Sequence, residues 1–225
     1  MVGKIEPPNV DTARHLRSVG PGGRALAITS LVLASGSRVR ARLLEDAGVE
    51  FITEPAGIDE PEIKAALRAE GASAAEVAEA LADLKAVRVS LRHPGALVVG
   101  ADQMLVCDGT WFDKPADRVQ ARADLMALRG RTHELACCAC VARDGARLWH
   151  HPASVRLTMR AFSDRFIDRY LEALDETALD CVGVYQLEGL GAQLFEEVDG
   201  DFFSILGLPL LPLLAFLRTH EVVPR

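Results

Sequence analysis

The chain has little that would attach it to a membrane or to nucleic acid. No apolar run approaches the ~18 residues of a membrane-spanning helix. The 25 basic residues are outnumbered by 32 acidic ones, for a net charge of −7, and they form no basic stripe. General nucleic-acid binding depends on such a stripe, so we expect neither nucleic acid nor a membrane among the partners. The default location for such a chain is the cytoplasm.

Cysteine is also scarce, and its arrangement is a poor disulfide framework. The count of five is odd, and Cys137, Cys138 and Cys140 crowd into one apolar run. Side chains alternate along a strand, so Cys138 and Cys140 are expected on one face and Cys137 on the other. Buried free thiols behave as small hydrophobes, which favours core packing over metal binding. The adjacent His150 and His151 would point to opposite faces and do not predict a shared metal site.

The distribution of apolar residues indicates one domain behind an extension. Residues 1–28 contain Pro7-Pro8 and Pro21-Gly-Gly23 without any apolar period, which predicts a poorly ordered N-terminal extension. Residues 29–220 show no repeat and no linker, and they predict a single domain. An apolar stretch after Arg24 is compatible with a signal peptide, but it continues directly into a turn of ligand-binding type, which favours a strand inside the domain.

Within the domain, strand and helix patterns alternate, as in an α/β protein. Strands are predicted over residues 31–34, 97–106, 133–142, 148–159, 183–187 and 193–198. Helices are predicted over 39–47, 61–91 in two pieces separated near Gly71, 118–128, 163–174 and 205–217. Asp108-Gly109 and Asp144-Gly145 are hairpin turn signals.

The most informative segment is Ser35-Gly-Ser37, which follows an apolar strand and precedes a helix. Ser37 is a natural N-cap, and Gly36 permits close approach of the backbone to a ligand. First-turn amides and the helix dipole favour an anion, most often phosphate. Arg40 adds a planar fork of donors that matches phosphate oxygens. The alternative is a capped helix with a solvated basic face.

Acidic residues and lysines are further candidates for functional residues. Asp102 lies inside an apolar strand, where a carboxylate must be paired, metal-bound, at an exposed end, or satisfied by backbone amides at a bulge. Gln103 is expected on the other side of a regular strand, or turned to a new direction if the strand bulges. Glu60 begins a helix, where an acid either favours the dipole or binds magnesium. Lys85 lies on the helix that ends before the Asp102 strand. The extended backbone before Pro115 limits the directions in which the Lys114 side chain can point.

These pieces occur together with other short motifs, in order, between Leu31 and Leu217. The motifs are Ser35-x-Ser37-x-x-Arg40, Asp59-Glu60, Lys85-Ala86, Gly100-Ala-Asp102-Gln103, Lys114-Pro115, Gly130-Arg-Thr-His133, Glu188-Gly189-x-Gly191 and Gly207-Leu-Pro209. In this combination the chain resembles the Maf family of septum formation inhibitors and nucleoside triphosphate pyrophosphatases. The resemblance implies an elongated mixed β-sheet flanked by helices, similar to the inosine-triphosphate pyrophosphatases, with a cleft between two lobes. A homodimer is compatible with it.

The resemblance also implies an activity. Members hydrolyse a nucleoside triphosphate to the monophosphate and pyrophosphate with a divalent metal, Mg²⁺ or Mn²⁺. By position, Asp102 is the proton acceptor or a metal ligand, and the residues leave both roles open. Glu60 is then the second acid, and Lys85 and Lys114 are catalytic or contact phosphate, as Ser35, Ser37 and Arg40 do. The alternative function is a non-enzymatic, nucleotide-binding regulator of septum formation. The lack of Gly-x-x-x-x-Gly-Lys-Ser/Thr argues against a kinase or a P-loop ATPase.

Three positions bear on which nucleotide base the site selects. The subgroup similar to 7-methyl-GTP pyrophosphatases has Trp, Gln and Glu where this chain has Val39, Gln103 and Glu188. Members that act on dTTP and UTP have Arg, Thr and Gln there. A carboxylate such as Glu188 suits the N1–H and N2–H₂ donors of guanine, whereas Val39 removes an aromatic ring that would stack on a cationic base. We therefore predict a preference for 7-methyl-GTP over dTTP.

Overall fold

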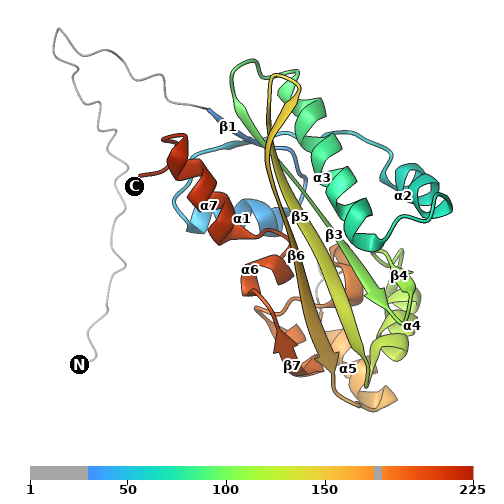
Figure 1. Cartoon of the computed structure of the whole chain (residues 1–225). Helices are drawn as coiled ribbons and strands as arrows, with labels where there is room; N and C mark the ends of the chain where they lie inside the picture. The colour runs from blue at the N-terminus through green and yellow to red at the C-terminus, as the bar shows by residue number, and fades with distance from the viewer. Residues whose placement is uncertain (1–29, 175–178, 225) are drawn as a thin grey trace, which may run out of the picture.

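The structure, a computed structural model, describes residues 30–174 and 179–224. The predicted N-terminal extension, residues 1–28, lies outside the described residues. In the described residues, a seven-stranded sheet carries helices on both faces, and no helix there is long and apolar enough to cross a membrane. The prediction of an α/β fold with an elongated mixed sheet flanked by helices is confirmed (Figure 1).

The elements agree closely with the pattern of the sequence. The strands are β1 (Leu31–Leu33), β2 (Ile52–Thr53), β3 (Leu97–Cys107), β4 (Thr110–Phe112), β5 (Thr132–Arg143), β6 (Ala146–Met159) and β7 (Phe195–Asp199). The α-helices are α1 (Arg38–Asp46), α2 (Glu60–Ala69), α3 (Ala74–Ser90), α4 (Arg118–Leu128), α5 (Asp164–Ala173), α6 (Phe202–Ile205) and α7 (Leu210–Thr219). Two 3₁₀ turns, η2 (Val182–Val184) and η3 (Leu190–Leu194), precede β7.

Capping residues and turn residues explain where the elements begin and reverse. Ser37 and Ser163 cap α1 and α5 as predicted, each accepting a hydrogen bond from a backbone amide of the first turn. Asp108 and Gly109 both have positive φ, 48° and 76°, which matches the twist of a two-residue hairpin between β3 and β4. The strong local signals of the sequence therefore survive in the fold.

Two predictions near the C-terminus are wrong. Residues 183–187 form no strand, because Gly183 and Val184 take φ values of 74° and 62°, which an extended chain does not have. Residues 205–217 are not one helix, because Gly207 at φ 88° separates α6 from α7. Pro209 is the N-cap of α7, so proline still marks the beginning of the C-terminal helix.

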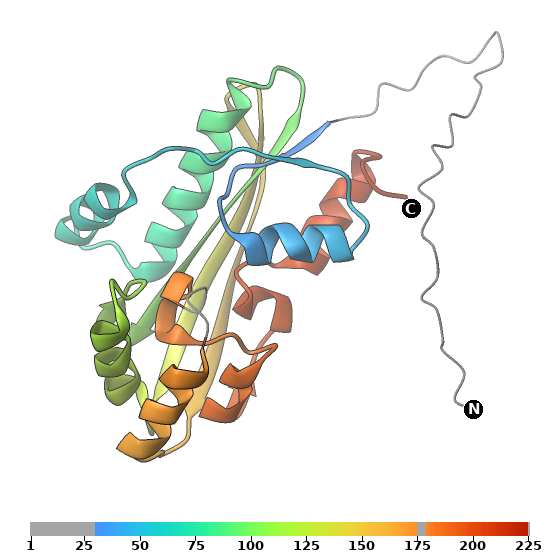
Figure 2. The same ribbon diagram turned by 180° about the vertical axis from the view of Figure 1, so that it is seen from behind.

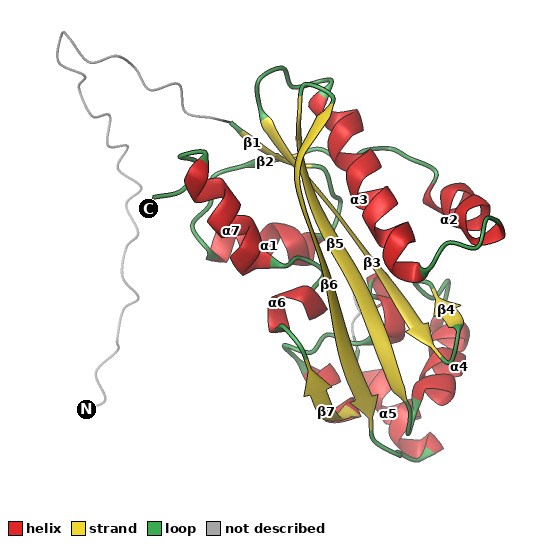
Figure 3. Cartoon of the chain, in the orientation of Figure 1, coloured by secondary structure: helices red, strands yellow, loops and turns green. Residues whose placement is uncertain are grey.

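The sheet is mixed because β1 pairs in parallel with β2 and β3, whereas the remaining neighbours are antiparallel. The order is β2-β1-β3-β5-β6-β7, and β4 pairs with β3. The long strands β3, β5 and β6 run the length of the molecule, as Figure 3 shows in yellow. Asp102 and Gln103 both lie on β3, near the middle of the sheet.

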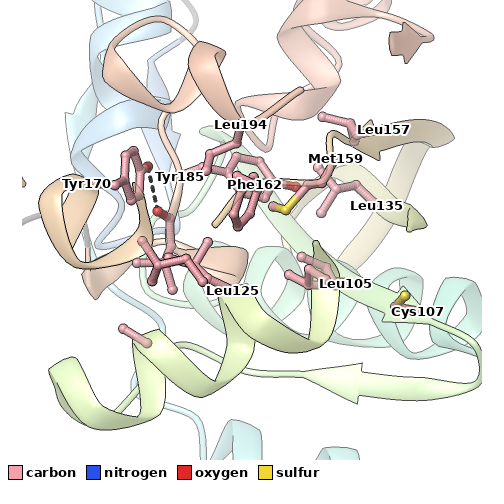
Figure 4. Close-up of a cluster of buried hydrophobic side chains, with 14 of the residues drawn as sticks. Leu105, Cys107, Leu125, Leu135, Leu157, Met159, Phe162, Tyr170, Tyr185 and Leu194 are labelled. Carbon is pink, nitrogen blue, oxygen red and sulfur yellow. Dashed lines mark hydrogen bonds between the residues drawn. The ribbon is translucent and has the colours of Figure 1, made fainter. Parts of the chain in front are cut away.

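Helix α3 covers one face of the sheet, packed on Met104 and the small side chains of β5. The opposite face carries two separate hydrophobic clusters. One cluster joins Ala101 and the start of β3 to α1 and α7. The other joins Leu105 to α4, α5 and Tyr185, and Figure 4 shows its side chains. Gln103 lies between Ala101 and Leu105 on the same face, so the strand passes from one cluster to the other at this residue.

Gly100 allows α3 to lie directly against β3. A Cβ at this position would meet the Ala82 carbonyl oxygen at 2.2 Å and the Ala86 amide nitrogen at 2.7 Å. Both atoms belong to the backbone of α3 and have no freedom to move aside. Because Lys85 lies between them in sequence, the missing side chain brings that lysine within reach of β3.

The cysteines behave as predicted. Cys138 and Cys140 pack against α3 with their sulfurs 4.0 Å apart, while burial raises the pKa of Cys137 on the other face to about 12. The Cys-x-x-Cys spacing of Cys137 and Cys140 is therefore divided between two faces of β5. All five thiols are free, and among the described residues no three His, Cys, Asp or Glu side chains gather as metal ligands.

A buried histidine makes the stability of the domain depend on pH. His133 is 2% exposed, its Nε2 lies 2.8 Å from the Tyr185 hydroxyl, and burial lowers its pKa from 6.5 to about 4. The folded chain therefore keeps a neutral imidazole at pH values where the unfolded chain binds a proton. The stability from this group is complete above pH 6.5 and is lost as the pH falls towards 4.

We expect unfolding in urea at pH 7 and pH 4 to reveal this group. Relative to His133→Gln, the wild-type chain should lose about 3 kcal/mol more of its free energy of unfolding between these pH values. Carboxylates that titrate in the same range contribute equally to both proteins and cancel. Equal losses in both would show that His133 is not held neutral by the fold.

Candidate active site

The site lies where one edge of β3 has no neighbouring strand. On this edge β3 pairs with β1 through residues 97–99 and with β4 through residues 105–107. On its other edge it pairs with β5 from Val98 to Val106 without interruption. Among the described strands, none pairs with residues 100–104 on the open edge. Asp102 is at the centre of this gap, in a regular strand without a bulge.

The turn after β1 fills part of the gap. Ser35 is buried, and its hydroxyl accepts hydrogen bonds from the Ser37 amide and the Arg40 Nη1, each at 3.2 Å. The Arg40 Nη1 also donates to the Ala101 carbonyl oxygen at 2.9 Å. Three residues of the predicted phosphate site, Ser35, Ser37 and Arg40, are thus brought together beside β3, as their spacing indicates.

Arg40 is held from the opposite side by the loop between α6 and α7. Its Nε donates to the Gly207 carbonyl oxygen at 2.7 Å. A Cβ on Gly207 would lie 3.1 Å from the same Nε, and φ at this residue is 88°, so glycine is needed both for space and for conformation. These bonds use Nε and Nη1, and they orient the guanidinium so that Nη2 is its remaining donor group.

A second group of residues meets on the α3 face of the gap. The Lys85 ammonium lies 2.6 Å from Asp102 Oδ1 and 2.7 Å from Glu60 Oε1. The side chains of Lys85 and Asp102 are only 8% and 7% exposed, whereas that of Glu60 is 41% exposed. One buried cation therefore joins two carboxylates from β3 and from the beginning of α2. Of the arrangements open to a carboxylate inside an apolar strand, the structure shows Asp102 paired with a lysine.

The two groups are electrostatically connected. Burial raises the pKa of Glu60, but the charge and hydrogen bond of Lys85, with smaller effects of Lys64 and Arg40, outweigh it and hold the pKa below its usual value. Glu60 therefore remains an anion within range of the Arg40 guanidinium. The Arg40 turn and the acid–lysine–acid group are therefore close enough for their charges to interact.

The residues present fit a divalent cation. Asp102 Oδ2 is buried and has no hydrogen-bond partner among the described residues. A buried carboxylate oxygen without a partner is costly unless something else binds it. Glu60 adds a second carboxylate on the same lysine. Magnesium is commonly held by one or two carboxylates together with substrate phosphates, so two acids suffice for this kind of site.

Gln103 lies on the opposite face of β3 from Asp102. Its Nε2 donates to the carbonyl oxygens of Ser204 at 2.9 Å and Ile205 at 3.1 Å, at the end of α6. With both amide hydrogens engaged, Oε1 is left as an acceptor. Val39 is half-buried in the first turn of α1. These two predicted base-selecting residues therefore lie on different elements of the site.

Lys114 and Glu188 are both exposed. Lys114 follows β4 and lines a cavity of about 480 Å³ between that segment and α4. Glu188 lies in the turn before η3. Burial raises the pKa of Cys181, Glu188 raises it further and Lys114 lowers it, so both charges act on the same thiol. No direct contact joins either residue to Asp102 among the described residues.

Two residues that orient Arg40 were not predicted as site residues from the sequence. Ala101 and Gly207 hold Arg40 through their carbonyl oxygens. A backbone acceptor has no residue-specific signal, so neither role is visible in the sequence. The Gly207-Leu-Pro209 motif marks this glycine in the sequence, but it does not indicate that its carbonyl oxygen accepts from Arg40.

The comparison with protein families gives one result. A family model described as "Maf: Maf-like protein" matches residues 30–220. This match covers the whole of the described domain except its last few residues, and it includes every candidate residue discussed above.

Two curated relatives agree with the family match. A "Nucleoside triphosphate pyrophosphatase" of Paramagnetospirillum magneticum is 59% identical over 194 residues, 86% of this chain and 100% of the relative. A "7-methyl-GTP pyrophosphatase" of Brucella abortus is 48% identical over 193 residues, 86% of this chain and 97% of the relative. A solved nucleoside-triphosphatase, a dITP/XTP pyrophosphatase of Mycobacterium abscessus, aligns with a TM-score of 0.38 and 16% identity, over 87% of this chain and 98% of that one.

Proposed function

This chain belongs to the Maf family, and we propose that it is a metal-dependent nucleoside triphosphate pyrophosphatase whose preferred substrate is 7-methyl-GTP. The observation that carries the proposal is the Glu60–Lys85–Asp102 group beside Arg40 at the open edge of β3. Relatives with 48–59% identity are named for this reaction or for this substrate.

The proposed reaction needs positive charge more than covalent chemistry. Water attacks the α-phosphorus, the bond to the bridging oxygen breaks, and the monophosphate and pyrophosphate separate. Negative charge develops on the phosphoryl oxygens and on the leaving pyrophosphate. Arg40, the first-turn amides of α1 and Lys114 are the donors that we assign to these oxygens. Arg40 is already oriented by three hydrogen bonds, so it needs little rearrangement.

Asp102 is the residue that we assign to the attacking water. Lys85 holds Oδ1, which leaves the buried Oδ2 free to accept a proton or to bind a cation. A Mg²⁺ or Mn²⁺ ion, when bound, would supply Lewis-acid activation of the phosphate and of water. Asp102 and Glu60 are the residues that would hold it. Lys85 keeps both carboxylates in place and limits their mutual repulsion.

The base preference rests on Glu188 and Gln103. The Glu188 carboxylate accepts hydrogen bonds, and guanine offers N1–H and N2–H₂ donors on one edge, with a positive charge after N7-methylation. Gln103 has its amide hydrogens engaged by α6, so it also offers an acceptor. Two acceptors suit a base with donors. Val39 provides no stacking ring for it.

The test is pyrophosphate release with Mg²⁺ from a panel of 7-methyl-GTP, GTP, dTTP, UTP, CTP and 5-methyl-UTP. We expect 7-methyl-GTP to lead dTTP by at least roughly tenfold in kcat/KM, because an acceptor in the site that loses its hydrogen-bond donor weakens binding. The Glu188→Gln variant should reduce that ratio while it retains turnover. Omission of the metal, with a chelator present, should stop the reaction.

Other results would change the proposal in defined ways. Turnover led by a pyrimidine nucleotide would retain the enzyme and remove the argument from Glu188. No turnover of any nucleotide, with nucleotide still bound, would favour the non-enzymatic regulator instead.

A further inference from the structure

Helix α2 carries a stripe of charged side chains that connects two parts of the site. Glu60, Lys64 and Arg68 are spaced by four residues and therefore lie along one face of the helix. Glu60 contacts Lys85 of α3 at 2.7 Å. One turn later, the Lys64 ammonium lies 2.7 Å from Asp113 Oδ1, and in the next turn the Arg68 guanidinium lies 4.7 Å from the centre of the Trp111 ring.

The far end of this stripe holds the segment that presents Lys114. Asp113 immediately precedes Lys114, and Trp111 belongs to β4. Pro115 follows, is buried, and restricts the backbone of Lys114 to extended conformations. The segment is therefore fixed by Pro115 on one side of Lys114 and by the contacts of α2 on the other. In Figures 1 and 2, α2 stands beside α3 and towards the end of the molecule where β4 and α4 lie.

Lys64 makes the more buried of the two contacts between α2 and the segment before Lys114. Its side chain is only 17% exposed, although it carries a charge, whereas Arg68 is exposed. A largely buried ammonium needs a partner, and Asp113 supplies it. None of the residues of α2 is fully buried, so the helix depends on half-buried Ile63 and Leu67 and on its polar contacts for its position. Loss of one such contact at the middle of the stripe should loosen the connection.

We propose that Lys64 is a positioning residue of the pyrophosphatase reaction: through Asp113 it sets where Lys114 stands relative to the Glu60–Lys85–Asp102 group. The inference rests on the proposed function, in which Lys114 contacts the substrate phosphates. Lys64 itself is proposed to position Lys114 and not to contact the substrate. A phosphate-binding cation that is displaced by about an ångström loses much of its effect on the transition state. Lys64 thus supports catalysis from the middle of α2 without touching the reacting atoms itself.

The test is a double-mutant cycle of Lys64→Met and Lys114→Met, with kcat/KM measured on the fastest substrate of the panel above. We expect Lys64→Met alone to lower kcat/KM about tenfold and Lys114→Met to lower it further. The double variant should be no worse than Lys114→Met, because Lys64 has nothing left to position. Lys64→Arg should recover most of the activity, since it retains the charge opposite Asp113.

Asp113→Asn supplies an independent route to the same contact. Its side chain is 69% exposed, so this variant is expected to fold even if a change at Lys64 disturbs α2. It should reproduce the loss seen in Lys64→Met. As a matched control, Arg156→Met removes a pair of the same length, 2.7 Å to Asp199, between β6 and β7, and should leave kcat/KM unchanged.

Each outcome separates this inference from the proposed function. An inactive wild-type chain would contradict the proposed function and, with it, this assignment. An active wild type with losses that multiply in the double variant would mean that Lys64 acts independently of Lys114, which overturns the inference alone. Wild-type activity in both Lys64→Met and Asp113→Asn would overturn it as well.

Discussion

Replacement of Asp102 by asparagine is expected to remove nearly all pyrophosphate release while the protein stays folded. Asparagine has the same shape and leaves no cavity, and Lys85 keeps its second partner, Glu60, at 2.7 Å. What disappears is the negative charge and the buried Oδ2 that has no hydrogen-bond partner among the described residues. Loss of a general base costs roughly 10²–10⁴ in rate, and loss of a metal ligand is of similar severity.

The measurement is kcat/KM for the wild type and Asp102→Asn at several concentrations of Mg²⁺. Partial recovery at high Mg²⁺ would identify Asp102 as a metal ligand, whereas a loss that does not depend on Mg²⁺ would identify it as the proton acceptor. Asp199→Asn, which changes an exposed acid on β7, is the control and should keep full activity. Substantial turnover by Asp102→Asn at ordinary Mg²⁺ would remove Asp102 from the mechanism.

Replacement of Lys85 by methionine should have the largest effect on stability. Lys85 is 6% exposed and neutralises two carboxylates at once. Removal of one partner from a buried ion pair typically costs about 3–5 kcal/mol, because the remaining charge is left buried and uncompensated. For a chain of this size, that corresponds to a fall of roughly 10 °C in Tm. Activity should also be lost, because Asp102 is no longer held in place.

Thermal and urea unfolding of Lys85→Met, Asp102→Asn and the double variant will check this. The double variant should be more stable than Lys85→Met alone, because it no longer buries an unpaired carboxylate. Additive losses in the double variant, or a Lys85→Met protein as stable as the wild type, would show that the pair contributes little to folding.

Much of the architecture could be predicted from local patterns. The alternation of apolar residues, the Ser37 and Ser163 caps and the Asp-Gly turns each act through neighbouring backbone atoms, so the residues themselves dictate the outcome. The same holds for the phosphate-type turn. The ordered motifs between Leu31 and Leu217 resemble the Maf family, and the family match over residues 30–220 confirms it.

The failures have a common physical cause. Val184 adopts a positive φ that its own side chain disfavours. Tertiary contacts stabilise it there: the Tyr170 hydroxyl donates to the Val184 carbonyl oxygen at 2.8 Å (Figure 4), and Tyr185 packs against His133 and Phe195. Such contacts leave no periodic pattern in the sequence. The local pattern therefore predicts a strand over 183–187, where the structure has none.

The sequence by itself determined which chemical groups are available: an acid in an apolar strand, a serine-capped helix with an arginine, and lysines with a second acid elsewhere. Only the tertiary structure decided which of them meet. It is Gly100 that lets α3 approach β3 and bring Lys85 to Asp102, and the open edge of β3 that admits Arg40. Pairing across many residues depends on how helices pack on the sheet, and packing is a property of the whole fold.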